Sequence, residues 1–246
     1  MNLLYKFPLR LKISLELIPK SQLFIVSVLL YSLITGCGSN TVFQADFSDN
    51  PINQPPSTTQ KVGTVRTDGP ANSVIVVNLS PNLPGKWIEV SRADNPSAVA
   101  ALQGTLKEFG GVGVYVFTCT LVIPDGSGAV TVQFERFNQP ANQYETFLHI
   151  DFMETNQVRV DDEANTLFGT FPRNTPFIVQ VTLDINSSAS DAKIVLSGAG
   201  ASGQANRQIT FNSLAQQFGA VRLWMGFPFV GSFNATNIVV KKEDAN

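Results

Sequence analysis

The feature that most restricts the fold is a succession of short apolar or alternating runs between residues 41 and 242, separated by turn signals such as Asp–Gly, Asn–Ser and Gly–Ser. Runs of this length with these boundaries are typical of β-strands, and we predict about a dozen. They lie at 42–47, 73–79, 86–90, 98–102, 112–123, 129–137, 146–152, 157–160, 176–185, 192–197, 208–211, 221–227 and 233–241. Helical periodicity is scarce, with one short turn expected at 213–218. Many strands with little helix indicate a single all-β domain, either a sandwich or a barrel.

Alternation within the strands predicts which side chains are buried. Val130, Val132 and Phe134 alternate with polar residues, so we expect one face of this strand in the core and the other in water. Residues 124–128 are expected to form a hairpin between 112–123 and 129–137. Residues 50–59 are expected to form a loop, and the glycines in 197–204 predict a mobile surface loop.

The N-terminus has the organisation of an export signal. Four Lys or Arg and one Glu lie within residues 1–20, and the stretch Leu23–Ile34 is apolar apart from two serines. A bilayer span needs about 20 apolar residues, so this shorter run predicts the central region of a signal peptide.

The residues that follow, Leu33–Ile34–Thr35–Gly36–Cys37, resemble the lipobox of bacterial lipoproteins. This resemblance implies cleavage before Cys37, with 1–36 as the signal peptide and 37–40 as a lipidated tether to a membrane of the bacterial cell envelope. In a bacterium with two membranes, Gly38 after the cysteine favours the outer one. A lipidated Cys37 cannot form a disulfide, so we expect Cys119 to be a small buried apolar residue.

The charge of the exported part argues against nucleic acid as a partner. Beyond residue 36 the chain carries 13 Lys and Arg and 18 Asp and Glu, a formal net charge of −5. This mildly acidic balance lacks the basic patch that nucleic-acid binding requires.

The two ends of the domain carry a further resemblance. Val42–Ser48 resembles the opening strand of concanavalin A-like jelly rolls, and Ser232–Val240 resembles their closing strand. The resemblance implies an antiparallel jelly-roll β-sandwich over 41–242, with its two ends paired in one sheet, followed by a tail at 243–246.

One segment offers candidate catalytic residues. His149, Asp151 and Glu154 are similar in spacing to the three acids of the active-site strand of laminarinase-type β-glucanases. Asp151 and Glu154 match the second and third acids, but His149 replaces the first, and imidazole cannot form the glycosyl ester of a retaining mechanism. In the alternative interpretation, 154–157 is a hairpin turn after an ordinary strand. A lyase using His149 or Tyr144 as base, with Arg159 neutralising a uronate, is a further interpretation.

Metal chemistry is weakly represented. The chain has a single histidine, which excludes a zinc site built from several histidines. We therefore expect no cofactor. The run Asp161–Asp162–Glu163 could supply oxygen ligands for Ca²⁺, although a solvated turn is the favoured interpretation.

Aromatic side chains are the candidates for ligand contact because sugar rings stack on exposed aromatic faces. We consider Trp87, Tyr144 and Trp224 as candidate ligand-binding residues, with Tyr115, Phe227 and Phe229 as further aromatics. The sequence thus predicts a lipid-anchored envelope module that binds glycan or another envelope partner on its concave sheet without catalysis. A polysaccharide-degrading enzyme centred on His149, Asp151 and Glu154, or a purely structural envelope lipoprotein, are the alternatives.

Overall fold

The computed structural model describes residues 39–93, 99–161, 166–186, 189–211, 216–226 and 228–243. Cys37 and the signal segment fall outside these ranges, as do Asp162, Glu163 and Phe227. Every regular secondary-structure element of the described part is a β-strand, in agreement with the predicted all-β fold class. Its strands are β1 (Ser39–Ala45), β2 (Thr64–Asp68), β3 (Val74–Val77), β4 (Trp87–Arg92), β5 (Ala100–Gly110), β6 (Gly113–Val122), β7 (Val130–Asn138), β8 (Gln143–Phe152), β9 (Gln157–Val160), β10 (Gly169–Thr170), β11 (Phe177–Ile185), β12 (Ser190–Gly198), β13 (Ser202–Ile209), β14 (Gln216–Met225) and β15 (Gly231–Glu243).

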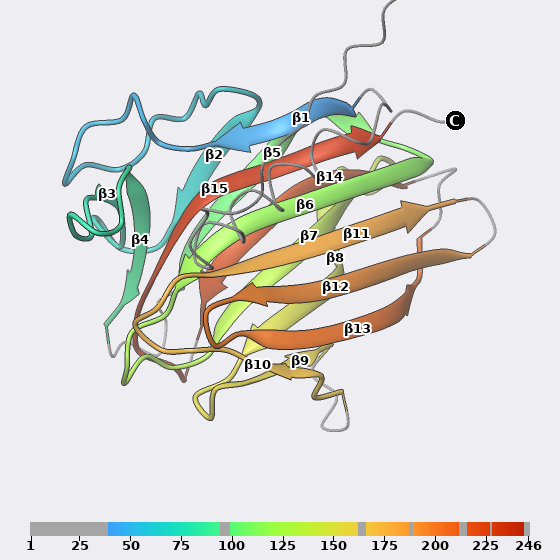
Figure 1. The fold of residues 1–246 in the computed structure, drawn as a ribbon. Helices are drawn as coiled ribbons and strands as arrows, with labels where there is room; N and C mark the ends of the chain where they lie inside the picture. The colour runs from blue at the N-terminus through green and yellow to red at the C-terminus, as the bar shows by residue number, and fades with distance from the viewer. Residues whose placement is uncertain are drawn as a thin grey trace, which may run out of the picture. The chain divides into compact units, whose positions relative to one another are not determined.

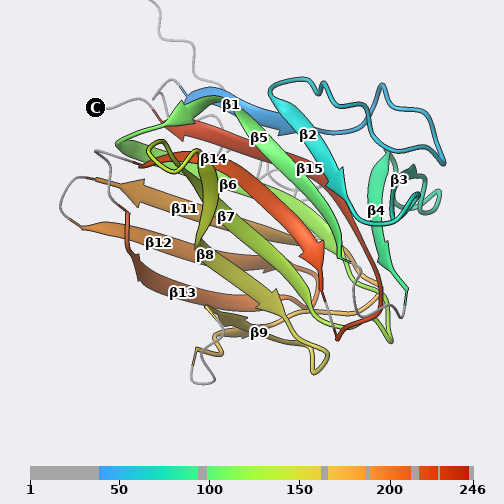
Figure 2. The same cartoon turned by 180° about the vertical axis from the view of Figure 1, so that it is seen from behind.

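All strand pairs are antiparallel and form one continuous path, β2-β5-β14-β7-β8-β9-β10-β13-β12-β11-β6-β15-β4-β3, with β1 added beside β15. The path folds over at β9, β10 and β13, so that two layers lie face to face (Figures 1 and 2). We call β2, β5, β14, β7, β8 and β9 the β7 layer, and β13, β12, β11, β6, β15, β1, β4 and β3 the β6 layer. This arrangement is a jelly-roll-like β-sandwich, which confirms the predicted fold class.

Aromatic side chains fill the space between the layers. Phe117 of β6 meets Phe134 of β7 edge to face, with ring centroids 5.1 Å apart. Tyr115 of β6 meets Phe218 of β14 in the same way at 5.5 Å. All four side chains are fully buried, so the inward face of each layer forms one hydrophobic core.

The two ends of the domain pair as predicted. β1 runs antiparallel to β15, with Ala45 opposite Ile238 and Asn40 opposite Lys242. None of the described segments forms a helix with the length and hydrophobicity that a bilayer span requires.

Three local predictions are wrong. Residues 124–128 do not form a hairpin, because β6 pairs with β11 and β15 while β7 pairs with β14 and β8. The segment instead connects the two layers. Its turn-forming residues are compatible with such a connection as well as with a hairpin, so they do not distinguish the two. Residues 197–204 belong mostly to β12 and β13, which pair directly, so only a short turn connects them. Of the helical turn expected at 213–218, residues 216–218 lie in β14 instead, and residues 213–215 fall outside the described ranges.

Candidate functional site: a pocket on the outer face of the β7 layer

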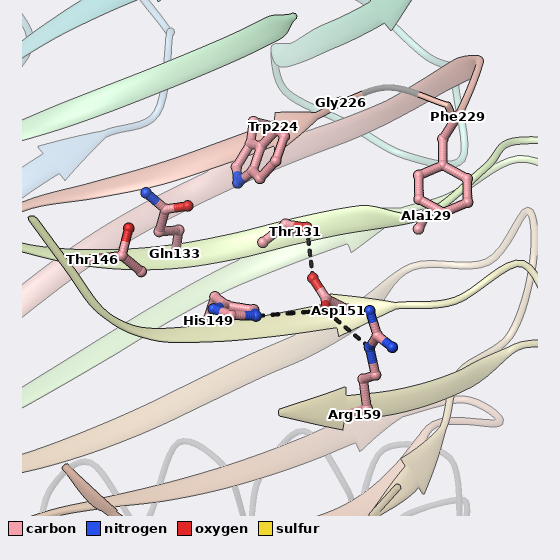
Figure 3. A pocket seen from close by; sticks show the side chains of 10 residues that line it. All are labelled: Ala129, Thr131, Gln133, Thr146, His149, Asp151, Arg159, Trp224, Gly226 and Phe229. Atoms are coloured by element: carbon pink, nitrogen blue, oxygen red, sulfur yellow. Dashed lines mark hydrogen bonds and ion pairs between the residues drawn. The ribbon is translucent and has the colours of Figure 1, made fainter. Parts of the chain in front are cut away.

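The candidate site is a pocket of about 430 Å³ on the outer face of the β7 layer (Figure 3). Successive side chains of a strand point to opposite faces, so residues of neighbouring strands gather in rows. One row joins Arg159 of β9, Asp151 of β8, Thr131 of β7 and Trp224 of β14. We call this site the Trp224 pocket; it is lined by Ala129, Thr131, Gln133, Thr146, His149, Asp151, Arg159, Trp224, Gly226 and Phe229.

Asp151 is the buried charge of the pocket, with 5% of its surface exposed. Its Oδ1 accepts a hydrogen bond of 2.7 Å from the Thr131 hydroxyl, and its Oδ2 accepts one of 3.1 Å from Arg159 Nε. Because both oxygens have partners on neighbouring strands, the carboxylate is fixed in place and its charge is balanced.

His149 lies beside Asp151 and between two carboxylates. Its Nε2 is 3.7 Å from Asp151 Oδ2, and its Nδ1 is 3.9 Å from Asp161 Oδ1. The backbone N–H of His149 also donates to Asp161 Oδ1 at 3.2 Å. The imidazole therefore occupies a polar position in the wall, with 22% of its side chain exposed.

Two aromatic side chains flank the opening. Trp224 projects from the end of β14, and its ring packs over Gly226, where a Cβ would come within 2.1 Å of the indole Cζ3. Phe229 lies across the pocket from Trp224 (Figure 3). The backbone of Phe229 is fixed by the buried Arg92, which donates a hydrogen bond to the Phe229 carbonyl oxygen.

The floor of the pocket continues toward a second hollow of about 430 Å³ beside Tyr144. Glu135 of β7 accepts hydrogen bonds from the side-chain amides of Gln133, which lines the Trp224 pocket, and Gln103, which lines the hollow. Glu135 is only 4% exposed. One hydrogen-bonded chain therefore runs beneath both hollows.

Tyr144 reaches over the neighbouring strands toward this second hollow. Its ring lies against Gly219, where a Cβ would stand 2.9 Å from Tyr144 Cε1. Burial raises the pKa of the Tyr144 phenol, a hydrogen bond with the Thr105 side chain lowers it, and the nearby Glu135 carboxylate raises it further. The phenol is therefore neutral at physiological pH.

Arginine side chains around the pocket are matched with carboxylates at distances of 2.9 to 3.2 Å. Glu135 differs from these carboxylates, because the side chains that donate hydrogen bonds to it are the neutral amides of Gln133 and Gln103. The pairs are Arg159–Asp151, Arg222–Asp68, Arg66–Asp68 and Arg207–Asp161.

The structure separates the candidate catalytic residues. His149 and Asp151 line the Trp224 pocket, whereas Glu154 is exposed in the turn between β8 and β9 and does not line it. The Glu154 carbonyl is held by Arg173, which also binds the Met153 carbonyl. The geometry thus matches the interpretation of 154–157 as a hairpin turn.

The candidate ligand-binding aromatic residues and the candidate calcium ligands also lie at separate places. Trp224 lines the Trp224 pocket and Tyr144 the second hollow, but Trp87 is buried at 4% exposure and lines neither. Asp161 accepts a hydrogen bond from Arg207, while the other two acids of the proposed calcium run lie outside the described residues. Across the described ranges, no group of three His, Cys, Asp or Glu side chains is placed to hold a metal ion.

Sequence reasoning missed the polar floor. The residues at 131, 133 and 135 were expected to face water, yet Thr131, Gln133 and Glu135 are at most 9% exposed. Larger side chains of the neighbouring strands, such as Arg222 and Trp224, lie beside them on the same face. The sequence did offer one signal. Glu135 is a charged residue on a strand face whose other residues, Thr131 and Gln133, are neutral, and such a charge can mark a functional site.

The comparisons with known proteins concern the fold. No protein-family model and no curated protein matches the sequence. A protein of unknown function from Shewanella oneidensis MR-1 has a similar structure, with a TM-score of 0.52 and 11% identity over 95% of this chain and 100% of that chain. For lectin II from Ulex europaeus, the TM-score is 0.48 and the sequence identity is 8%, and the match covers 85% of this chain and 99% of the lectin chain. For the CBM2 module of the evolved Dit of Lactobacillus casei BL23 phage J-1, the TM-score is 0.44 and the sequence identity is 13%. The match covers 85% of this chain and 98% of that chain.

Proposed function

We propose that this protein is a lipid-anchored β-sandwich of the bacterial cell envelope that binds glycans in the Trp224 pocket without cleaving them. The observation that carries the proposal is the pairing of aromatic and polar surfaces in one hollow. Trp224 and Phe229 supply ring faces, while Asp151, Arg159 and Gln133 supply polar groups beside them. A sugar ring presents an apolar face and a rim of hydroxyl groups, which these two surfaces complement.

Binding rather than hydrolysis is supported by the placement of the acids. Glycosidases use two carboxyl groups that flank the scissile bond. Asp151 is buried with both oxygens engaged, and Glu154 lies in the turn outside the pocket. The lyase alternative requires an arginine for a uronate carboxylate, and Arg159 is bonded to Asp151 instead.

The binding proposal can be tested by affinity electrophoresis of the full-length protein, kept in detergent, through gels containing laminarin, mannan, alginate or polygalacturonate. Trp224→Ala should abolish the retardation that the wild type shows. Ile178→Ala is the matched control, because Ile178 is 41% exposed on β11 of the β6 layer. Equal retardation of wild type and Trp224→Ala would contradict the proposal.

Catalysis is tested on the same polysaccharides by measuring new reducing ends and unsaturated products. We expect neither product, and we expect Glu154→Gln to bind as the wild type does because Glu154 does not line the pocket. Depolymerisation that disappears in His149→Ala, Asp151→Asn or Glu154→Gln would contradict the binding proposal and show that the protein is an enzyme.

The anchoring part of the proposal is supported by the lipobox-like residues before Cys37. Multiple acyl chains hold a protein firmly to a bilayer, since each buried methylene contributes about 0.8 kcal/mol. Mass spectrometry of the membrane-extracted protein should show a lipidated N-terminal cysteine, and Cys37→Ser should leave the leader uncleaved and unlipidated. An unmodified Cys37 thiol in the native protein would contradict it.

A further inference from the structure

Glu135 determines which atoms the floor of the Trp224 pocket presents. Its Oε1 accepts a hydrogen bond of 2.8 Å from Gln133 Nε2, and its Oε2 accepts one from Gln103 Nε2. An ionised carboxylate can only accept hydrogen bonds, so each glutamine must turn its NH₂ group toward Glu135. The amide oxygen of Gln133 is therefore left to face the Trp224 pocket, and that of Gln103 is left to face the second hollow.

The close view of the pocket agrees with this orientation. The Gln133 oxygen points to the side on which Trp224 lies, and its nitrogen points away (Figure 3). Gln133 and Gln103 are the cross-strand neighbours of Arg222, which lies between them on β14. The amide acceptors therefore border a strand that carries both Arg222 and Trp224.

Hydrogen-bond donors beside these acceptors have no partner among the described residues. The Trp224 Nε1–H and the Arg222 Nε–H are both buried atoms for which the protein supplies no acceptor. An unsatisfied buried N–H is energetically costly, so such a donor favours a ligand or water oxygen. The Trp224 donor and the Gln133 acceptor thus both belong to residues that line the Trp224 pocket.

We propose that Glu135 is a positioning residue that makes the Trp224 pocket selective for neutral, hydroxyl-rich sugars over uronates, an inference that rests on the proposed glycan binding. A sugar hydroxyl can accept from Trp224 Nε1 and donate to the Gln133 oxygen at the same time. A uronate carboxylate can only accept, and it would meet the negative charge of Glu135. The charges of Arg159, Arg207 and Arg222 are balanced by Asp151, Asp161 and Asp68, although Arg222 Nε itself has no acceptor among the described residues.

The test compares the affinity of full-length wild type and Glu135→Gln for neutral laminarin and mannan with their affinity for alginate and polygalacturonate. In Glu135→Gln the new side chain can donate as well as accept, so the amides of Gln133 and Gln103 are released from their fixed orientation. We expect the wild type to prefer the neutral polysaccharides. The variant should lose about tenfold in affinity for them, which equals about 1.4 kcal/mol, and should lose less for uronates.

A second variant keeps the test valid if Glu135→Gln destabilises the fold. Gln133→Met removes the amide acceptor but retains a side chain of similar length, so it should also weaken neutral glycan binding about tenfold. Gln180→Met is its matched control, because Gln180 is exposed on β11 of the β6 layer. Unfolding curves of all variants identify any general loss of structure.

The outcomes separate this inference from the proposed function. Preferential wild-type binding of uronates, or an equal loss for both polysaccharide classes in Glu135→Gln, would overturn the selectivity role while glycan binding stands. Binding of no polysaccharide, or binding that is insensitive to Trp224→Ala, would overturn both. A reduced ratio of neutral to uronate affinity in Glu135→Gln, with native stability, supports the inference.

Discussion

The indole of Trp224 lies against Gly226 so closely that a Cβ on that glycine would stand 2.1 Å from Cζ3. The next nearest atoms to such a Cβ also belong to the indole, at 3.0 Å. Since these atoms are the far end of a side chain at the mouth of a pocket, the ring rather than the backbone would move. The glycine thus sets the position of the aromatic wall.

Gly226→Ala should therefore shift the Trp224 ring and weaken polysaccharide retention, with a change of at most about 1 kcal/mol in the free energy of unfolding. Affinity electrophoresis measures the first effect and urea unfolding the second. Gly111→Ala provides the control, because no heavy atom lies within 4 Å of the Cβ position. Retention that is unchanged in Gly226→Ala would show that the ring position has no part in binding.

Arg173 connects its own segment with residues 124–127 and 153–156. Its guanidinium donates to the carbonyls of Pro124, Ser127, Met153 and Glu154, and its Nε donates to Asn156 Oδ1. Arg173→Met leaves these acceptors without their partner and should cost about 2–3 kcal/mol in the free energy of unfolding.

The measurement is urea unfolding together with limited proteolysis of the turn at 153–156, which should become faster in Arg173→Met. Arg173→Lys retains the charge, but its three donors leave one point and cannot span the acceptors. It should be destabilised nearly as much. A lysine variant as stable as the wild type would show that charge alone stabilises these segments.

Much of the fold was predictable because core strands carry a strong local signal. Val130, Val132 and Phe134 alternate with polar residues, and such a pattern requires a strand with one apolar face. Polar edge strands lack it. In β13 exposed residues such as Ser202 and Gln204 alternate with small residues, and only its end was predicted, within the run 208–211. β2 (Thr64–Asp68) has one buried apolar residue and was not predicted. Pairing partners depend on contacts between distant segments, which explains the error at 124–128.

The site was only partly predictable for the same reason. His149, Asp151 and Trp224 stand out as rare or charged residues in apolar runs, and the structure brings all three to one pocket. Glu154 matched a spacing in the sequence, but whether it extends the strand or begins the turn depends on tertiary contacts with Arg173. The roles of Gln133 and Glu135 arise from cross-strand neighbours, and a single strand does not reveal them.

The thiol of Cys119 should be unreactive in the native protein. Its side chain is 1% exposed in the core of β6, and burial raises its pKa well above the ordinary value, which leaves very little thiolate. A thiol reagent should therefore label Cys119 only after denaturant is added. Labelling of the folded protein at the rate of a free thiol would contradict the placement of this strand in the core.

Tyr115 should make the protein less stable in alkali. Burial raises the pKa of its phenol from 10.0 to about 12, and the hydroxyl donates to the Gly111 carbonyl at 3.0 Å. Because the folded pKa is the higher one, the contribution is complete below about pH 10 and is lost as the pH rises through about 12. One pKa unit corresponds to about 1.4 kcal/mol, so the loss is up to about 3 kcal/mol.

Tyr115→Phe isolates this contribution from that of other groups that titrate in alkali. The variant loses the hydrogen bond to Gly111 and should be about 1 kcal/mol less stable near neutral pH. It cannot ionise at this position, so its stability should fall less steeply than that of the wild type between about pH 10 and about pH 12. Urea unfolding across this range gives the two curves, which should converge and then cross. Parallel curves would mean that the phenol ionises as easily in the folded chain as in the unfolded one, and therefore that water reaches it between the two layers.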